Sequence, residues 1–276
     1  MISLKAWAKI NIGLKILDKR DDGFHNIETT FATINLSDLL ALEAAGSGVV
    51  VEANDPGIKE EDNLCFHAAD LFRRRYGITE GVRIKLIKNI PIGAGLGGGS
   101  SDAAATMKGM ARLFNMNIED SEFMSLAAEI GADVPFFIKG GAAYARGRGE
   151  ELKFFKLPCM EIVLYYPGYP ISTKWAYDEY DKTMLTPGVD VDSIVQKKKK
   201  KIRQGFALEN DFEKVIFKFH PDLLDVKMSL LSAGGFFASL SGSGSCLFTM
   251  VDEGTRPKVV KYLEGIGAQY FEVNTI

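Results

Sequence analysis

A glycine-rich segment at residues 91–102 constrains this chain more than any other part of it. It reads Pro-Ile-Gly-Ala-Gly-Leu-Gly-Gly-Gly-Ser-Ser-Asp, with five glycines in seven residues. An alternating strand pattern precedes it over 82–87, and a helical pattern follows over 100–114. Glycine lets the backbone adopt positive φ and approach a ligand closely, and the free N–H groups of a helix start attract anions. The segment therefore predicts a phosphate-binding loop, with helix-capping residue types in Ser100, Ser101 and Asp102; a flexible surface loop is the alternative.

Two familiar phosphate loops do not fit this segment. A Walker loop ends in Gly-Lys-Ser/Thr, whereas these glycines precede Ser-Ser-Asp and the loop contains no lysine. Gly93, Gly95 and Gly98 match the dinucleotide spacing, in which an acidic residue about 20 positions later holds the ribose. That residue would be Asp120 or Glu122, inside a second helical pattern. A Rossmann oxidoreductase is therefore the weaker alternative.

Composition limits the class of protein. The 276 residues are 46% hydrophobic, enough for one large or two medium domains, and the net charge of −3 argues against wholesale nucleic-acid binding. Cys65, Cys159 and Cys246 show no metal or disulfide spacing and suit a reducing compartment. The sequence shows no secretory signal and no apolar run near the ~20 residues that a membrane span needs. We expect a cytoplasmic protein without a membrane partner, either a monomer or a homodimer.

A run of five lysines, Lys197 to Lys201, is the one low-complexity feature. We interpret it as a solvated, self-repelling segment in preference to a polyphosphate or membrane patch.

Strand and helix patterns alternate irregularly in both halves of the chain. This favours an α+β protein of two domains, residues 1–157 and 158–276, joined at Pro158. Strands are expected over 4–17, 27–36, 82–87, 160–166, 236–240, 246–251 and 270–273, with a strand and turn over 142–149. Helices are expected over 63–76, 100–114, 120–130, 173–180, 210–219 and from Pro257 onward.

Three motifs together resemble those of the GHMP kinases, the superfamily of galactokinase and of homoserine, mevalonate and phosphomevalonate kinases. They are Ala8-Lys9-Ile10-Asn11, the glycine loop and Ser241-Gly242-Ser243-Gly244-Ser245, in the family's order and spacing. From its residues alone, the third motif is either an anion-binding nest or a tight strand connection. The resemblance implies an N-terminal ATP-binding lobe like ribosomal protein S5 domain 2 and a C-terminal ferredoxin-like lobe on the substrate side. The active site would lie between them.

The resemblance also assigns ATP to the glycine loop. Mg²⁺ is expected with it, because the phosphoryl charge must be neutralised during transfer, and Ser101 is a candidate ligand. The expected ATP-binding residues are Pro91, Gly93, Ala94, Gly95, Leu96, Gly97, Gly98, Gly99, Ser100 and Ser101.

Asp133 and Lys9 are the expected catalytic pair. By themselves, Asp133 reads as a cap or turn aspartate before Pro135, and Lys9 as an exposed strand lysine. The family places its catalytic aspartate at this Gly-Ala-Asp-Val-Pro position and a partner lysine at the position of Lys9. The resemblance therefore implies that Asp133 receives the hydroxyl proton of the acceptor, while Lys9 keeps it ionised and offsets phosphoryl charge.

The segment Gly23-Phe24-His25 and residues 131–137 resemble the branch of the family that phosphorylates the 2-hydroxyl of a cytidine-diphosphate-linked methylerythritol, in the non-mevalonate isoprenoid route. There, His25 would pair with cytosine and Tyr177 would stack on it. Phe24 stands where the branch commonly has tyrosine, and Tyr177 where many members have phenylalanine. The residues expected to bind the substrate are Asn11, Phe24, His25, Thr173, Tyr177, Gly242 and Ser243; Asn210-Asp211 resembles a further segment near the pocket, without an assigned role.

Two alternatives remain open. Another GHMP kinase, for mevalonate or homoserine, would need cationic residues for a carboxylate instead of the base-reading pair His25 and Tyr177. A non-catalytic nucleotide sensor would keep the loop, but the presence of both Asp133 and Lys9 argues against it.

Overall fold

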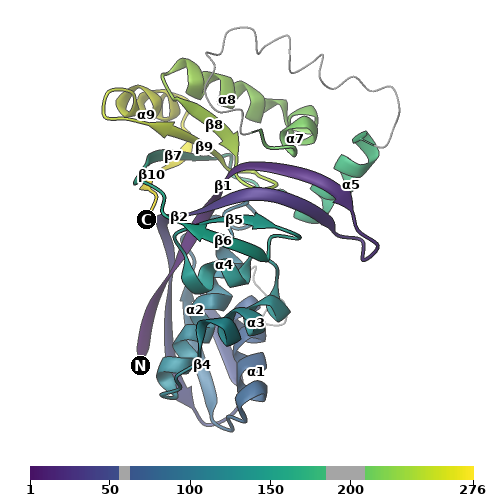
Figure 1. The fold of residues 1–276 in the computed structure, drawn as a ribbon. Coiled ribbons are helices and arrows are strands. Elements are labelled where there is room, and N and C mark those ends of the chain that lie inside the picture. Colours follow the sequence, from purple (N-terminus) through teal and green to yellow (C-terminus); the bar gives the residue numbers. More distant parts are fainter. Residues whose placement is uncertain (56–62, 185–208) are drawn as a thin grey trace.

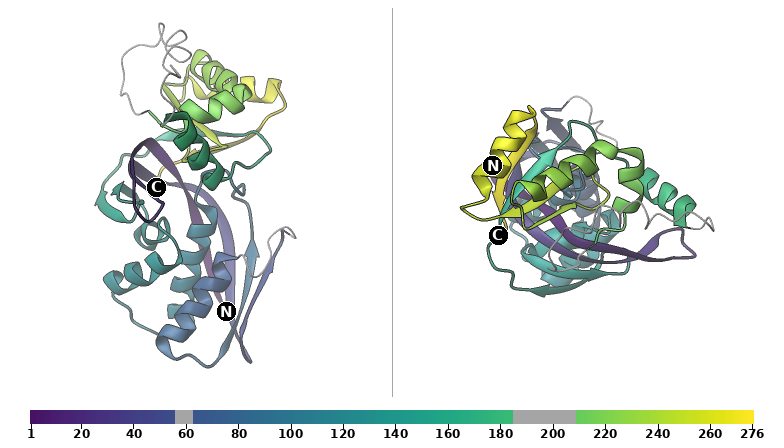
Figure 2. Two further views of the ribbon diagram at one scale, coloured as in Figure 1. Left: turned by 90° about the vertical axis from the view of Figure 1, so that its right-hand side faces the viewer. Right: turned by 90° about the horizontal axis from the view of Figure 1, so that it is seen from above.

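The computed structural model describes residues 1–55, 63–184 and 209–276, which form two stacked lobes (Figure 1). Figure 2 shows the same division from the side and from above. The lysine run at 197–201 lies outside the described residues.

A six-stranded sheet carries the first lobe. Its two long strands, β1 (Ile2–Lys19) and β2 (His25–Ala45), form an antiparallel hairpin that extends from the first lobe to the second (Figure 1). Residues 8–14 of β1 are buried on both faces because the middle of the strand lies between the lobes. Bulges interrupt the hairpin, one of them at Gly13, whose φ is 75°. The sheet order is β3-β4-β2-β5-β6, with β1 beside β2, β3 (Val49–Ala53), β4 (Gly81–Ile87), β5 (Ala142–Arg146) and β6 (Glu151–Phe155).

Helices cover one face of this sheet. α1 (Leu64–Tyr76) starts at Asn63, whose Oδ1 accepts a hydrogen bond from Cys65 N at 2.9 Å, and stops at Gly77 in the left-handed region. α2 (Gly98–Leu113) lies directly on the sheet, since a Cβ at Gly109 would come within 2.8 Å of leucine side chains of β1 and β2. α3 (Asp120–Ile130) and α4 (Val134–Lys139) complete the layer.

The second lobe has the strand order of a ferredoxin-like fold. Its antiparallel sheet runs β10-β7-β9-β8, with helices on one side in a β-α-β-β-α-β succession. The elements are β7 (Glu161–Tyr166), α5 (Thr173–Met184), α7 (Glu213–Phe219), α8 (Pro221–Ser232), β8 (Phe237–Leu240), β9 (Leu247–Val251), α9 (Arg256–Gly265) and β10 (Gln269–Asn274).

The sequence patterns missed four elements, β3, α4, β6 and α8. α4 is a single short turn with Pro135 near its start, and the charged pattern of β6 resembled a loop. α8 carried a readable signal, because Pro221 begins it and buried Leu223, Val226 and Leu230 repeat at helical spacing. The expected helix over 210–219 starts later, at Glu213. The joint proposed at Pro158 lies between β6 and β7, and the division into domains stays a prediction.

Candidate active site

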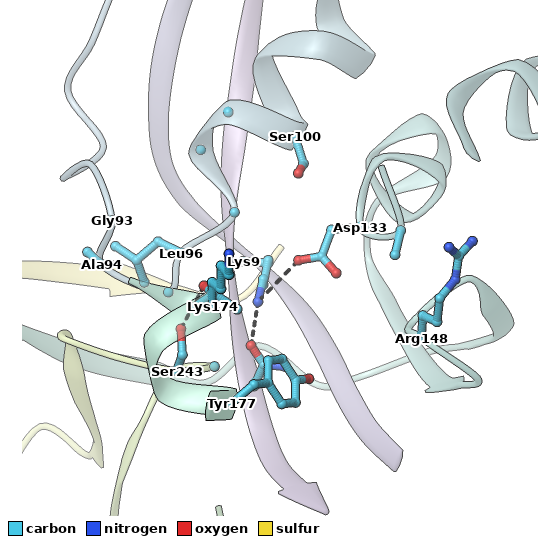
Figure 3. Close-up of a pocket in the computed structure, with 18 of the residues that line it drawn as sticks. Lys9, Gly93, Ala94, Leu96, Ser100, Asp133, Arg148, Lys174, Tyr177 and Ser243 are labelled. Atoms are coloured by element: carbon cyan, nitrogen blue, oxygen red, sulfur yellow. Dashed lines mark hydrogen bonds and ion pairs between the residues drawn. The ribbon is translucent and has the colours of Figure 1, made fainter. Parts of the chain in front are cut away.

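A cavity of about 880 Å³ lies where the lobes meet. The β1–β2 hairpin, the glycine loop, the residues before α4, the start of α5 and the 242–243 turn all contribute to its wall (Figure 3). Ser101 is the exception among the expected site residues, since it is buried beside a separate cavity of about 90 Å³. The others all line the main cavity: Lys9, Asn11, Phe24, His25, Pro91, Gly93, Ala94, Gly95, Leu96, Gly97, Gly98, Gly99, Ser100, Asp133, Thr173, Tyr177, Gly242 and Ser243.

Three glycines of the glycine loop adopt backbone conformations in which any other residue would be strained. Gly93, Gly95 and Gly97 have φ angles of 64°, 75° and 68°. A Cβ on Gly95 would lie 1.9 Å from the carbonyl oxygen of Ser241. The Ser241 hydroxyl donates a hydrogen bond to Gly95 O at 2.8 Å, so the loop is held directly against the third motif.

No side chain caps α2, and the expectation that Ser100, Ser101 or Asp102 does so is wrong. The helix begins at Gly98, with Gly97 at the N-cap position and no side-chain hydrogen bond to its first turn. The three polar residues already lie inside the helix, where Ser101 and Asp102 are buried. The first N–H groups of α2 are therefore left for a ligand, together with the positive end of the helix dipole.

Lys88 brings a positive charge to the start of α2. It follows β4, and its Nζ binds Asp38 and Asp102, the latter at 2.6 Å. A Cβ on Gly98 would lie 3.2 Å from this Nζ. Burial, together with the nearby carboxylate of Asp38, raises the pKa of Asp102 to about 7, although Lys88 opposes the shift. The cation that the loop sequence lacks is thus supplied from just before the loop, a proximity that sequence reasoning missed.

Lys9 and Asp133 form an ion pair in the wall of the cavity. Lys9 is buried, so its interpretation as an exposed strand lysine is wrong. Its Nζ lies 3.6 Å from Asp133 Oδ2. The same Nζ donates a hydrogen bond to Asn11 Oδ1 (Figure 3). Burial lowers the pKa of Lys9, and the negative charge of Asp133 counteracts part of this effect.

Asp133 occupies the N-cap position of α4 without capping it. Its carboxylate accepts no hydrogen bond from that helix, and the side chain is 33% exposed. A carboxylate so placed has oxygen lone pairs available to a molecule in the cavity.

The third motif links the loop to the second lobe. The Ser243 and Thr173 hydroxyls lie 2.9 Å apart and share a hydrogen bond. Asn210 Nδ2 donates to Leu240 O at 2.9 Å and to Gly242 O at 2.8 Å. Asn210 therefore supports the turn from behind, a position that the sequence left without a role.

His25, Tyr177 and Phe24 gather at the other end of the cavity. The rings of His25 and Tyr177 are stacked with centroids 4.7 Å apart and planes 9° from parallel. Phe24 is 55% exposed, and the Arg148 guanidinium lies 5.2 Å from its ring centroid. His25 Nε2 lies 2.6 Å from Asp181 Oδ1. Sequence reasoning missed Arg148 and Asp181, because no local pattern distinguishes them from ordinary surface charges.

Two further features are absent from the described part of the chain. Residues 1–55, 63–184 and 209–276 contain no group of three His, Cys, Asp or Glu side chains arranged to hold a metal ion. None of the helices in these ranges combines the length and apolar character that crossing a membrane requires.

Family models match both lobes. The model for the GHMP kinases N terminal domain matches residues 63–141, and the GHMP kinases C terminal model matches 193–268. The fold alone is shared with a mevalonate kinase from Methanococcus jannaschii, at 17% identity and a TM-score of 0.70 over 100% of this chain and 98% of that one. The fold and the site thus define a GHMP kinase, an ATP-dependent small-molecule kinase.

Closer relatives narrow the class. The chain is 42% identical to the 4-diphosphocytidyl-2-C-methyl-D-erythritol kinase of Prosthecochloris aestuarii (strain DSM 271 / SK 413), over 91% of this chain and 89% of that protein. It is 44% identical to the kinase of that name from Chlorobium phaeobacteroides (strain BS1), over 91% and 90%. A crystal structure of 4-(cytidine 5'-diphospho)-2C-methyl-D-erythritol kinase matches with a TM-score of 0.81 and 32% identity over 100% of both chains. The chain belongs to the 4-diphosphocytidyl-2-C-methyl-D-erythritol kinase family.

Proposed function

We propose that this chain transfers the γ-phosphoryl group of ATP to the 2-hydroxyl of 4-diphosphocytidyl-2-C-methyl-D-erythritol, giving the 2-phosphate and ADP, in the non-mevalonate isoprenoid pathway. Family membership supports the reaction. The observation that carries the mechanism is the Lys9–Asp133 pair, whose Nζ and Oδ2 atoms lie 3.6 Å apart in the cavity that the uncapped start of α2 also lines.

The ATP phosphates bind at the start of α2. There the N–H groups of the first turn donate hydrogen bonds to phosphate oxygens, and the helix dipole favours their charge. Lys88 adds a nearby positive charge on one side and Lys9 on the other. Because these groups are held before the ligand arrives, the chain spends little free energy on reorganising them.

Asp133 receives the proton of the acceptor hydroxyl. Phosphoryl transfer depends mainly on placing the acceptor oxygen in line with the γ-phosphorus and on stabilising charge. The half-buried carboxylate of Asp133 accepts a hydrogen bond from the hydroxyl and takes its proton as the new O–P bond forms. Lys9 pairs with Asp133 and stabilises the negative charge that spreads over the phosphoryl oxygens. Asn11 orients the Lys9 ammonium through its Oδ1.

The cytidine end of the substrate binds near His25. The stacked rings of His25 and Tyr177 leave no space for a third ring between them at 4.7 Å. In place of the expected stacking of Tyr177 on cytosine, we propose that cytosine lies against the exposed ring of Phe24 with its polar edge toward His25. Tyr177 then supports the histidine ring. Arg148 and Lys174 line the same cavity and offer positive charge to the diphosphate.

ATP would bring Mg²⁺ to this cavity. In such sites it is held mostly by phosphate oxygens and water, with one or two carboxylates, so the lack of a metal cluster in the described residues is compatible with its use. Ser101 does not suit the role of a protein ligand, because it is buried beside another cavity. When bound, the ion neutralises phosphate charge.

A panel assay tests the proposed function. Purified protein is incubated with Mg-ATP and, separately, the cytidyl erythritol substrate, mevalonate, phosphomevalonate and homoserine, and ADP release is measured. We expect turnover with the cytidyl substrate alone. Phosphorylation of mevalonate or homoserine in its place would make the chain a different GHMP kinase, and ADP release with none of the four would favour the nucleotide sensor.

A further inference from the structure

We propose that Asp181 is a positioning residue that sets the tautomer of His25, so that the cavity prefers cytosine over uracil. This inference rests on the proposed function, because it assumes that His25 faces the base of a nucleotide substrate. No sequence motif pointed to Asp181, which lies on α5, 156 residues from its histidine partner.

Asp181 bridges α5 and the end of the β1–β2 hairpin, which lie side by side in Figure 1. Its Oδ1 lies 2.6 Å from His25 Nε2, and its Oδ2 accepts a hydrogen bond from Lys19 Nζ at 2.6 Å. The side chains of His25 and Asp181 are 6% and 17% exposed, so water competes little for this contact. Each carboxylate oxygen thus has its own partner.

The charge state of Asp181 determines what His25 must do. Burial would raise the pKa of Asp181, but the hydrogen bonds from Lys19 and His25, together with the charge of Lys19, outweigh it and hold the pKa below its usual value. An ionised carboxylate only accepts hydrogen bonds, so Nε2 of His25 must carry a proton. In the neutral ring, Nδ1 is then an acceptor.

The ring of His25 cannot easily turn away from this arrangement. Tyr177 covers one of its faces, and the Nε2 contact sets its rotation in the plane. Nδ1 makes no hydrogen bond to another residue in the described part of the chain, and the side chain lines the cavity. The chain therefore presents one acceptor, in a set direction, at the end of the cavity where the base is proposed to lie.

An acceptor at this point separates the two pyrimidines. Cytosine carries an amino group at C4, which donates a hydrogen bond to Nδ1. Uracil carries a carbonyl oxygen there, which would face the Nδ1 lone pair and leave both acceptors unsatisfied. Leaving a polar group unpaired in a desolvated site is costly, so Lys19, Asp181 and His25 act in sequence to favour cytosine.

A purely structural role for Asp181 makes a different prediction. If it only fastened α5 to the hairpin, its loss would weaken both pyrimidine substrates alike and leave their ratio unchanged. The ratio of kcat/KM for the cytidine substrate to that for its uridine analogue therefore distinguishes the two roles.

The test uses Asp181→Asn, which preserves the shape of the side chain. Because the Lys19 ammonium only donates, the asparagine oxygen faces Lys19 and its amide group donates to Nε2. Nε2 then becomes the acceptor and the proton moves to Nδ1. We expect the cytidine-to-uridine ratio of kcat/KM to fall at least 10-fold, with KM for ATP unchanged. Glu179→Gln is the matched control, because Glu179 is a carboxylate of the same helix whose partner at 2.6 Å is Lys182; it should retain the wild-type ratio. An unchanged ratio in Asp181→Asn would overturn the proposal.

A second measurement does not depend on the variant folding or on turnover. Nitrogen NMR of the wild-type protein at alkaline pH reports which ring nitrogen of His25 carries the proton. We expect Nε2–H for His25, and Nδ1–H would overturn the proposal. Failure of the wild type to phosphorylate either pyrimidine substrate would instead refute the proposed function, while leaving the tautomer measurement to stand or fall separately.

Discussion

The two ends of the cavity are built from different chemical groups. At the proposed phosphate end, the cavity wall is formed by the main chain of residues 93–98, shaped by glycines and by the uncapped start of α2. At the base end, side chains form it, with His25 held by Tyr177 and Asp181 from another lobe. A site formed by the main chain can thus be predicted from the local sequence. A site formed by side chains depends on which distant elements meet in the folded protein.

A bulky side chain in the glycine loop should prevent ATP from binding at the phosphate end. Gly97→Val places a branched side chain where even a Cβ would lie 2.8 Å from Phe137 and φ is positive. We expect ATP binding to fall by more than 100-fold, measured by titration calorimetry. Gly141→Val is the matched control, because Gly141 has a φ of 77° and open space around its Cβ position; it carries similar strain outside the cavity. Equal ATP affinity in the two variants would place the phosphates elsewhere.

Asp133→Asn separates chemistry from binding at the middle of the cavity. The amide keeps the shape of the side chain but cannot take the hydroxyl proton. We expect kcat to fall on the order of 10²-fold or more, while ATP affinity stays close to that of the wild type. Steady-state kinetics and calorimetry on the same preparation measure both, and near-normal turnover would remove Asp133 from the mechanism.

A substitution at the base end should change KM for the cytidyl substrate and not KM for ATP. Tyr177→Ala removes the ring that supports His25, so we expect KM for the cytidyl substrate to rise roughly 10-fold, given the loss of a stacked aromatic contact. KM for ATP should change little. Equal increases in both KM values would mean that Tyr177 supports the whole cavity, and the contrast between its two ends would be lost.

The smallest expected effect is on the pH dependence of the free energy of unfolding, through Asp102 in α2. Folding raises the pKa of Asp102 to about 7, so the folded protein keeps a proton there that the unfolded chain loses near pH 4. The stability of the wild type should therefore fall between about pH 4 and 7 relative to Asp102→Asn, which has no proton to lose. Urea unfolding at pH 5 and pH 7.5 measures the difference. A difference in stability that is independent of pH would contradict the buried, partly neutral Asp102.

Local patterns predicted the local structure well. The glycine loop lies between β4 and α2 as expected, and α1 begins and ends at the residues whose side chain or glycine conformation stops a helix, Asn63 and Gly77. The wrong cap at Ser100–Asp102 has a local reason too. Glycine is itself an accepted N-cap residue, so Gly97 starts the helix three residues before the first serine.

Local sequence patterns could not predict which residues surround each side chain of the site. Lys9 resembled an exposed strand lysine because alternation in β1 cannot reveal that Phe31, Phe137 and the glycine loop surround its side chain. Lys88, Arg148 and Asp181 acquire their roles from elements that approach only in the folded chain. The resemblance to a family supplied Asp133 and Lys9, and the computed structure brings their side chains together.

The most direct test is a crystal structure of the protein with a non-hydrolysable ATP analogue and the cytidyl substrate. We expect the triphosphate against the first turn of α2, with the γ-phosphorus facing an acceptor oxygen within hydrogen-bond reach of Asp133. A triphosphate away from residues 93–98, or an acceptor oxygen out of reach of Asp133, would contradict it.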